Sequence, residues 1–227
     1  MNIEKIKQTF PPLIDHVMDR KVFLFSIAIA LGLIGVFLEL TSEMLEEESV
    51  ALIDGRIITF VATFRHNTLN GMAVDLTALG SFTVLTIFTI LGMLILHFLK
   101  NHKGALYLIL GSAGSAVLST LMKNFFSRER PTEVEKLVEV SSYSYPSGHS
   151  LSASAFYLLI AFLVFTSFEK LKDRMLIFLF FITLILGIGG SRIYLGVHYP
   201  SDVMAGILLG SAWTFLLTAI FYGRRNS

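Results

Sequence analysis

Six long apolar stretches, separated by shorter polar connections, set the pattern of the 227-residue chain. A helix of about 20 apolar residues crosses the roughly 30 Å hydrocarbon core of a membrane. The fifth stretch reaches that length only if its helix continues through Ser191 to Tyr194. The predicted spans are Val22 to Leu40, Val74 to Leu99, Gly104 to Met122, Leu151 to Phe168, Met175 to Gly190 and Val203 to Tyr222. The pattern predicts an all-α bundle of six transmembrane helices, with residues 1–227 as a single membrane-embedded domain.

Two further segments space their apolar residues as amphipathic helices do. The connection between the first two spans begins with acidic residues and continues with Leu52, Ile53, Ile57, Phe60, Val61 and Phe64. This spacing fits a helix in the outer membrane interface, and it fits a soluble cap packed on the bundle equally well. Leu13, Ile14, Val17 and Met18 predict a similar interfacial helix on the inner side, before the first span.

Composition supports a membrane protein and excludes several other classes. Hydrophobic residues make up 54% of the chain and charged residues only 15%, against about a quarter charged in soluble domains. A net charge of +1 without a basic block argues against a nucleic-acid partner. The absence of cysteine excludes disulfides and thiolate metal sites. The first apolar run is longer than that of a signal peptide and no small-residue cleavage site follows it, so we expect an uncleaved first helix.

The distribution of basic residues predicts the orientation of the bundle. The leader, the second and fourth connections and the tail carry eleven Lys and Arg, whereas the other three connections carry seven. Cytoplasmic segments are the ones enriched in Lys and Arg. We therefore expect a multi-pass protein of the cell membrane with both termini in the cytoplasm and with the first, third and fifth connections on the extracytoplasmic side.

Small residues mark two of the predicted spans. They are Gly111, Ser112, Ser115, Ala116 and Ser119 in the third span and Gly187, Gly189 and Gly190 at the end of the fifth. Small side chains allow membrane helices to approach closely. The sequence therefore predicts that these two helices are central to the bundle.

Three charged blocks fall on the predicted outer side. They are "KNFFSRERP" from Lys123 to Pro131, "YPSGHS" from Tyr145 to Ser150 and "SRIYLGVHYPSD" from Ser191 to Asp202. Proline is favoured at the first turn of a helix, so Pro146 and Pro200 are predicted to start the fourth and sixth spans. Helix N-termini attract anions through their unpaired N–H groups and the helix dipole.

The basic side chains of these blocks indicate a phosphate ligand. Lys123, Arg130 and Arg192 would surround two helix starts, where Ser147 and Gly148 offer backbone N–H groups. The guanidinium fork of arginine matches phosphate oxygens. Each residue alone would be typical of an interfacial anchor or a helix cap. The hypothesis depends on the three blocks converging.

Two histidines add reactive groups to the cluster. Asp202 follows His198 by four residues, so it can accept a hydrogen bond from one ring nitrogen and leave the other free as a nucleophile. His149 has no acid beside it in sequence and is the better candidate to protonate a leaving group. Together they predict a bell-shaped pH dependence whose apparent pKa values belong to the pair. The other histidines, which we expect to be solvated, are His16, His66, His97 and His102.

The three blocks resemble the signature of the type-2 phosphatidic acid phosphatase superfamily, the lipid phosphate phosphatases. That signature is a lysine followed after six residues by Arg-Pro, then Pro-Ser-Gly-His, then Ser-Arg, five residues, His, three residues and Asp. Lys123 with Arg130-Pro131, Pro146 to His149, and Ser191-Arg192 with His198 and Asp202 match it at every position.

The resemblance implies a role for each of these residues. His198 would attack phosphorus and form a phosphohistidine, with Asp202 orienting it. His149 would protonate the leaving alcohol and then activate water. The phosphoryl oxygens would be held by Lys123, Arg130, Ser147, the Gly148 amide and Arg192. No metal and no cofactor is implied.

The resemblance leaves the substrate and some alternatives open. The family offers phosphatidylglycerophosphate, polyprenyl diphosphate, phosphatidic acid and lipid A phosphates as substrates, and the sequence does not select among them. A phosphotransferase could use the same residues with a lipid or sugar hydroxyl as acceptor. A vanadate-dependent haloperoxidase shares the anion pocket, but six spans argue against it. A non-catalytic lipid-binding or transport protein of the same fold should have lost a key side chain, and none is lost.

Overall fold

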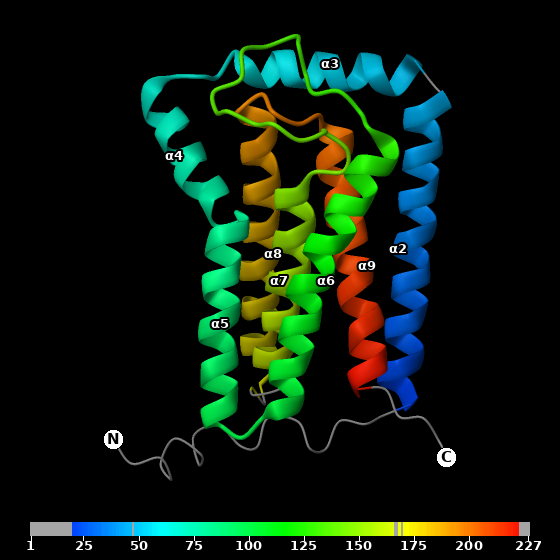
Figure 1. Ribbon diagram of the computed structural model, residues 1–227, viewed down its shortest axis with the longest axis vertical. Helices are drawn as coiled ribbons and strands as arrows, with labels where there is room; N and C mark the ends of the chain where they lie inside the picture. The colour runs from blue at the N-terminus through cyan, green and yellow to red at the C-terminus, as the bar shows by residue number, and fades with distance from the viewer. Residues whose placement is uncertain (1–19, 47, 166–167, 169, 223–227) are drawn as a thin grey trace.

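The computed structural model describes residues 20–46, 48–165, 168 and 170–222, and within them the chain forms helices and loops without a β-strand. The helices are α2 (Arg20–Glu46), α3 (Glu48–Ala62), α4 (Asn67–Ala78), α5 (Phe82–Phe98), α6 (His102–Phe126), α7 (Gly148–Phe165), α8 (Leu171–Tyr194) and α9 (Pro200–Tyr222). Figure 1 shows an upright bundle with α3 lying across one end. The predicted leader helix from Leu13 to Met18, and His16, lie outside the described residues.

The observed helices agree with the spans predicted from hydropathy, with one difference. Five described helices are long and apolar enough to cross a membrane, and the number is six if α4 and α5 count as one bent span. The fifth predicted span does continue to Tyr194. The second is broken, because α4 and α5 meet at an angle of 44°.

The break between α4 and α5 is held by specific contacts. A Cβ at Gly80 would lie only 3.3 Å from the His149 carbonyl oxygen and 2.6 Å from the Ile188 side chain, so a residue without a side chain lets the break approach the start of α7. The Tyr157 hydroxyl donates to the Leu79 carbonyl at 2.9 Å, and the Ser81 hydroxyl caps α5 by accepting from the Val84 N–H. These bonds satisfy backbone groups that the bend leaves without intrahelical partners.

The centre of the bundle is formed by α7 and α9, the most buried of the candidate spans. The prediction that the third and fifth spans are central is therefore wrong. The small residues of α6 and α8 do allow close contacts, such as Gly111 against Leu159. However, the opposite faces of these two helices expose large apolar side chains, including Leu121 on α6 and Leu179 on α8, as expected of faces turned toward lipid.

Two glycines bring α9 into contact with α7. A Cβ at Gly206 would lie 2.6 Å from the Ser147 carbonyl oxygen, and one at Gly210 would lie 2.2 Å from the Leu151 carbonyl oxygen. Real Cβ atoms do not approach backbone oxygens so closely, so both positions require glycine. This contact fixes the first turns of α7 and α9 relative to each other.

The predicted amphipathic helix between the first two spans is present as α3. It packs against α8 and α9 and turns Asp54 and Ile58 inward, with 2% and 0% of their surface exposed. Leu52 and Phe60 are exposed on the other side. The position of α3 across the end of the bundle is visible in Figure 1.

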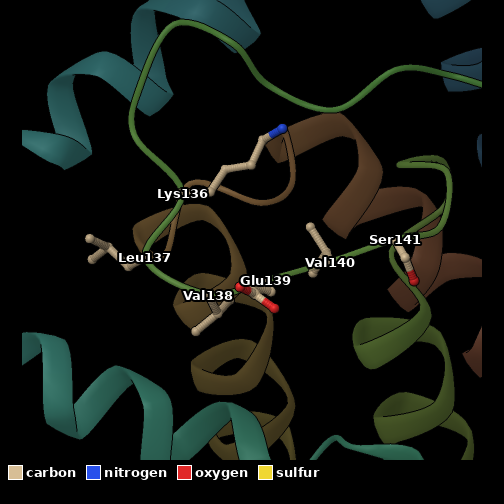
Figure 2. Close-up of a pocket in the computed structure, with 6 residues that line it drawn as sticks. All are labelled: Lys136, Leu137, Val138, Glu139, Val140 and Ser141. Atoms are coloured by element: carbon tan, nitrogen blue, oxygen red, sulfur yellow. The ribbon is translucent and has the colours of Figure 1, made fainter.

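A long loop, residues 127–147, covers the same end of the bundle as α3. It is tied down by the Leu137 N–H, which donates to the Leu195 carbonyl, and by Tyr145, whose buried hydroxyl is 2.7 Å from the Thr41 hydroxyl. Figure 2 shows Lys136 to Ser141 along this loop, where they line a cavity of about 740 Å³. None of these six residues belongs to the charged blocks.

The α7–α9 contact predicts that Gly210→Ala is destabilising. The added Cβ must displace backbone of α7, and overpacking of this kind costs about 1–3 kcal/mol. We expect a lower Tm in detergent. Gly32→Ala on α2 is the matched control, because a Cβ there meets nothing within 4 Å. An equal Tm for both variants would show that the close approach is not required.

Candidate active site

The structure brings the three charged blocks together at the end of the bundle beneath α3. Lys123 comes from the last turn of α6, Arg130 from the loop, Arg192 from the last turn of α8, and His198 from the short connection before α9. Gly148 and His149 lie in the first turn of α7, and Ser147 immediately precedes it. Asp202 lies in the first turn of α9. The convergence expected from the sequence is therefore observed.

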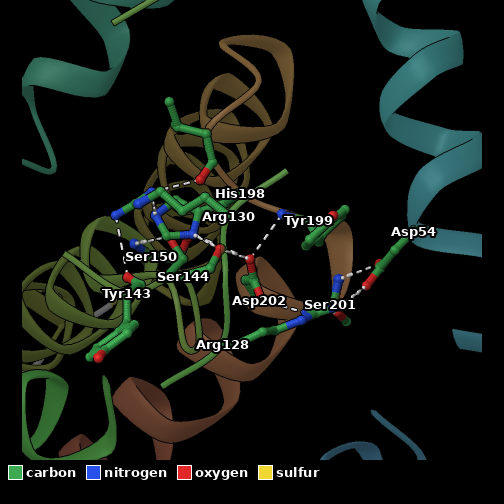
Figure 3. Close-up of polar contacts among 12 residues, drawn as sticks. Asp54, Arg128, Arg130, Tyr143, Ser144, Ser150, His198, Tyr199, Ser201 and Asp202 are labelled. Atoms are coloured by element: carbon green, nitrogen blue, oxygen red, sulfur yellow. Dashed lines mark hydrogen bonds and ion pairs between the residues drawn. The ribbon is translucent and has the colours of Figure 1, made fainter. Parts of the chain in front are cut away.

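His198 is almost completely buried, with 1% of its surface exposed. Its Nδ1 lies 3.4 Å from Asp202 Oδ2 and 3.3 Å from Ser144 Oγ, and its Nε2 lies 3.2 Å from Arg130 Nη1 (Figure 3). Arginine can only donate, so Nε2 must present a lone pair toward it. The proton consequently resides on Nδ1, facing Asp202, and Nε2 is the nitrogen available for attack.

The Asp202 carboxylate is fully buried and held by several donors. Its Oδ2 accepts from the Tyr199 N–H at 2.9 Å and from the Ser144 hydroxyl, and its Oδ1 accepts from Arg128 Nη1 at 2.5 Å. The bond to His198 is the longest of the set. The sequence reasoning missed Ser144 and Arg128, although Arg128 lies within the first charged block and is the other arginine there.

The three cations predicted to hold phosphate form no salt bridge within the described part of the chain. Arg130 donates to the carbonyl oxygens of Ser142 and Val197 at 2.7 and 2.6 Å, and Lys123 donates to that of Tyr143. Arg192 is 3% exposed and donates from Nη1 to the Thr77 hydroxyl, while its Nε has no hydrogen-bond partner among the described residues. Arg192 is thus a buried cation and Lys123 and Arg130 are partly buried ones, and cations in such positions that form no salt bridge favour an anionic ligand.

The start of α7 is shaped for close contact with α6. The helix begins at Gly148, two residues after Pro146, so the prediction that this proline opens the helix is wrong, whereas Pro200 does open α9. A Cβ at Gly148 would lie 2.9 Å from Ser119 Oγ. The Ser147 hydroxyl accepts from the Ser150 hydroxyl at 3.0 Å, and the Ser147 N–H donates to the Asp202 carbonyl at 2.9 Å.

Two adjoining cavities connect this site with the side of the bundle. The first, of about 360 Å³, is lined by Lys123, Gly148 and His149 among others. The second, of about 430 Å³, lies among α5, α6 and α7 and is mainly apolar. Phe82, Ala116 and Ser152 line both cavities. The cavity that contains Lys123 and His149 thus adjoins an apolar groove between α5 and α6.

A further cavity lies on the loop side of Arg130. It has a volume of about 620 Å³ and is lined by Arg128, Arg130, Lys136 and Tyr143 among others. Arg130 therefore lies between this cavity, which the loop lines, and the buried His198. His66, His97 and His102 are exposed, away from these cavities.

Comparison with known proteins decides the family. The model of the PAP2 superfamily matches residues 104–226, more than half of the chain. The chain belongs to the PAP2 superfamily. This confirms the resemblance seen in the three blocks.

Individual relatives support the same assignment. Phosphatidylglycerophosphatase B of Bacillus subtilis is 29% identical over 80% of this chain and 90% of its own length. Undecaprenyl-diphosphatase of Sulfolobus acidocaldarius is 34% identical over 67% of this chain and 71% of its own length. The crystal structure of the PAP2 type phosphatidylglycerolphosphate phosphatase from Bacillus subtilis superposes with a TM-score of 0.78 at 28% identity, covering 84% of this chain and 94% of that one. Both of these relatives of the PAP2 protein, and the solved structure, are named as phosphatases.

The environment of His198 predicts its titration. Burial lowers the pKa of His198 to about 3, although Asp202 opposes the shift; Arg130 and Arg192 add to it. A base with a lowered pKa stays neutral until the pH falls to that value, so Nε2 keeps its lone pair at neutral pH. We expect the imidazole NMR signal that is lost in His198→Ala not to titrate between pH 5 and 8. A midpoint near the ordinary value of about 6.5 would contradict this.

Proposed function

We propose that this protein is a lipid phosphate phosphatase. It hydrolyses a phosphomonoester or diphosphate head group of a membrane lipid on the extracytoplasmic side, without a metal and through a phosphohistidine at His198. The observation that carries the proposal is the site itself. It combines a buried histidine with an oriented lone pair, cations that form no salt bridge with the described residues, and an apolar groove that adjoins the cavity containing His149.

The tautomer of His198 supports its role as the nucleophile. Attack by Nε2 forms the N–P bond and breaks the bond between phosphorus and the lipid oxygen. The positive charge that develops on the ring is stabilised by Asp202, toward which Nδ1–H is directed. Water then cleaves the N–P bond, which returns His198 to its neutral form and releases phosphate.

The position of His149 supports its role as the proton donor. It lines the cavity that adjoins the apolar groove, where a lipid tail and its leaving oxygen would lie. A group on that side can protonate the leaving alkoxide, and the same group can then take a proton from the attacking water. His198 would then act on the side of phosphorus where the N–P bond forms, and His149 on the side from which the lipid oxygen leaves.

The remaining predicted residues would stabilise the phosphoryl oxygens. Arg130 lies next to Nε2, and a phosphate at that nitrogen would compete for the N–H groups that now bond Ser142 and Val197. Arg192 offers its Nε, which donates to no group in the described part of the chain. Lys123, Ser147 and the Gly148 amide complete the set on the side of α6 and α7. Preorganised donors of this kind stabilise the charge of the transition state.

Sidedness and substrate follow from separate arguments. Both the start of α2 and the end of α9 lie at the end of the bundle opposite α3 (Figure 1). The cytoplasmic termini predicted from the basic residues would therefore put the site on the extracytoplasmic side. The relatives that cover most of the chain are named for phosphatidylglycerophosphate and undecaprenyl diphosphate. These two lipids are the first substrates to test.

Phosphate release is the direct assay. Purified protein in detergent with EDTA should release phosphate from at least one lipid in a panel of phosphatidylglycerophosphate, undecaprenyl diphosphate, phosphatidic acid and lipid A. His198→Ala should abolish release, and His149→Ala should lower it by about 10²- to 10⁴-fold because the leaving alkoxide loses its acid. Adding a lipid or sugar alcohol tests for transfer instead of hydrolysis. A silent wild type, or an active His198→Ala, would refute the proposal.

The groove between α5 and α6 predicts where the lipid tail lies. Ala113→Trp should fill the groove and displace about two methylenes from it, which corresponds to about 1.6 kcal/mol, or roughly 15-fold, in kcat/KM for a long-chain lipid phosphate. A dihexanoyl substrate should be affected much less. Val117→Trp on the same helix is the control, because Val117 is exposed outside the groove. Equal losses for both substrates would place the tail elsewhere.

A further inference from the structure

Asp54 is a buried carboxylate on α3, a helix that contributes no residue to the three charged blocks. Only 2% of its surface is exposed. We propose that Asp54 is a positioning residue for the nucleophile, an inference that rests on the proposed phosphatase function. By pairing with Arg128, Asp54 leaves Asp202 with the net negative charge that stabilises the positive charge developing on His198.

The contacts of Asp54 are directed to the start of α9 and to the loop. Its Oδ2 accepts from Arg128 Nη2 at 2.8 Å and from the Ser201 hydroxyl, and its Oδ1 accepts from the Ser201 N–H at 3.0 Å (Figure 3). Ser201 is the residue before Asp202. Asp54 therefore holds both the guanidinium that bonds Asp202 and the backbone that carries it.

Arg128 links the two carboxylates. Its Nη1 donates to Asp202 Oδ1 at 2.5 Å and to Ser201 Oγ at 2.8 Å, while its Nη2 donates to Asp54. The guanidinium also stacks over the Tyr199 ring, with 4.5 Å between its carbon and the ring centroid. This planar fork has one preferred orientation, so it fixes Asp202 Oδ1 and leaves Oδ2 facing His198.

The charges of the network formed by Asp54, Arg128 and Asp202 sum to one net negative charge. Asp54 and Asp202 contribute two negative charges and Arg128 one positive charge. Arg130 and Arg192 also act on His198, as does His149 when it is protonated, and each of these positive charges disfavours a positive imidazole. Without the charge of Asp54, the single charges of Arg128 and Asp202 would cancel in sum, and the positive charge that develops on the ring during attack would lose the net negative charge beside it.

A purely structural role for Asp54 predicts a different result. If Asp54 only docked α3, its loss would loosen the helix, and a second change at Arg128 would add to the damage. If the balance of charge matters, removal of the Arg128 charge in the Asp54→Asn background restores the net negative charge beside His198. The double variant separates the two possibilities.

The experiment is a double-mutant cycle of Asp54→Asn and Arg128→Gln, with phosphate release measured on a short-chain dihexanoyl lipid phosphate. We expect Asp54→Asn to lower kcat about tenfold with little change in KM, and the double variant to regain part of that loss. Glu46→Gln removes an exposed carboxylate at the same end of the bundle and should keep the kcat of the wild type. Tm and elution as a single species in detergent check folding.

Each outcome decides a different claim. A double variant at or below the kcat of Asp54→Asn, or Asp54→Asn with the kcat of the wild type, would overturn the role of Asp54 while the phosphatase proposal stands. A wild type that releases no phosphate would instead overturn the proposed function. If Asp54→Asn does not fold, the double variant, in which two amides replace the ion pair, should still keep kcat within about tenfold of the wild type, and its complete inactivity would contradict the proposal.

Discussion

The burial of the Asp202 carboxylate is the constraint on which the rest of the site depends. A buried charge is tolerated only when donors surround it. Here the donors come from segments that are distant in sequence: Arg128 and Ser144 from the loop, and Tyr199 from the connection before α9. The backbone carbonyl of Asp202 accepts a hydrogen bond from the N–H of Ser147, which lies just before α7. Satisfying Asp202 therefore assembles all three charged blocks around His198.

The packing of the bundle makes this assembly rigid. α7 and α9 are in contact through glycines, so the turns that carry His149 and Asp202 cannot move independently. The break between α4 and α5 approaches His149 through Gly80, and α3 closes the end of the bundle through Asp54. The reactive groups lie on helix ends held by the core, while the lipid-facing sides of α6 and α8 remain apolar and exposed.

Much of this arrangement could be predicted from the sequence. Hydropathy located the spans because each must be apolar over a fixed length, and the spacings around Lys123, His149 and His198 identified the family. The break after Ala78 was not predicted because the span was inferred from hydropathy alone, although Gly80 and Ser81, a pair of residues at which helices often kink, lie within it. The central helices were predicted wrongly because small residues indicate only that one face of a helix packs closely against a neighbour. They do not indicate that the helix is buried on all sides.

The supporting residues of the site were not predictable for a different reason. Asp54 and Arg128 are 74 residues apart and form an ion pair only after α3 folds over the bundle. Ser144 has no distinctive spacing from His198, and only the path of the loop places its hydroxyl against Asp202. Local patterns identify groups that react, whereas groups that orient them are selected by tertiary contacts.

The central claim is that His198 Nε2 becomes phosphorylated. The most direct measurement is to trap the phosphoenzyme of His149→Ala with ³²P-labelled para-nitrophenyl phosphate, whose leaving group needs no acid, and to locate the label by mass spectrometry after an alkaline quench. We predict an acid-labile, alkali-stable phosphate on the peptide that contains His198, absent when His198→Ala is added. Label on any other residue, or label that survives the loss of His198, would contradict the mechanism.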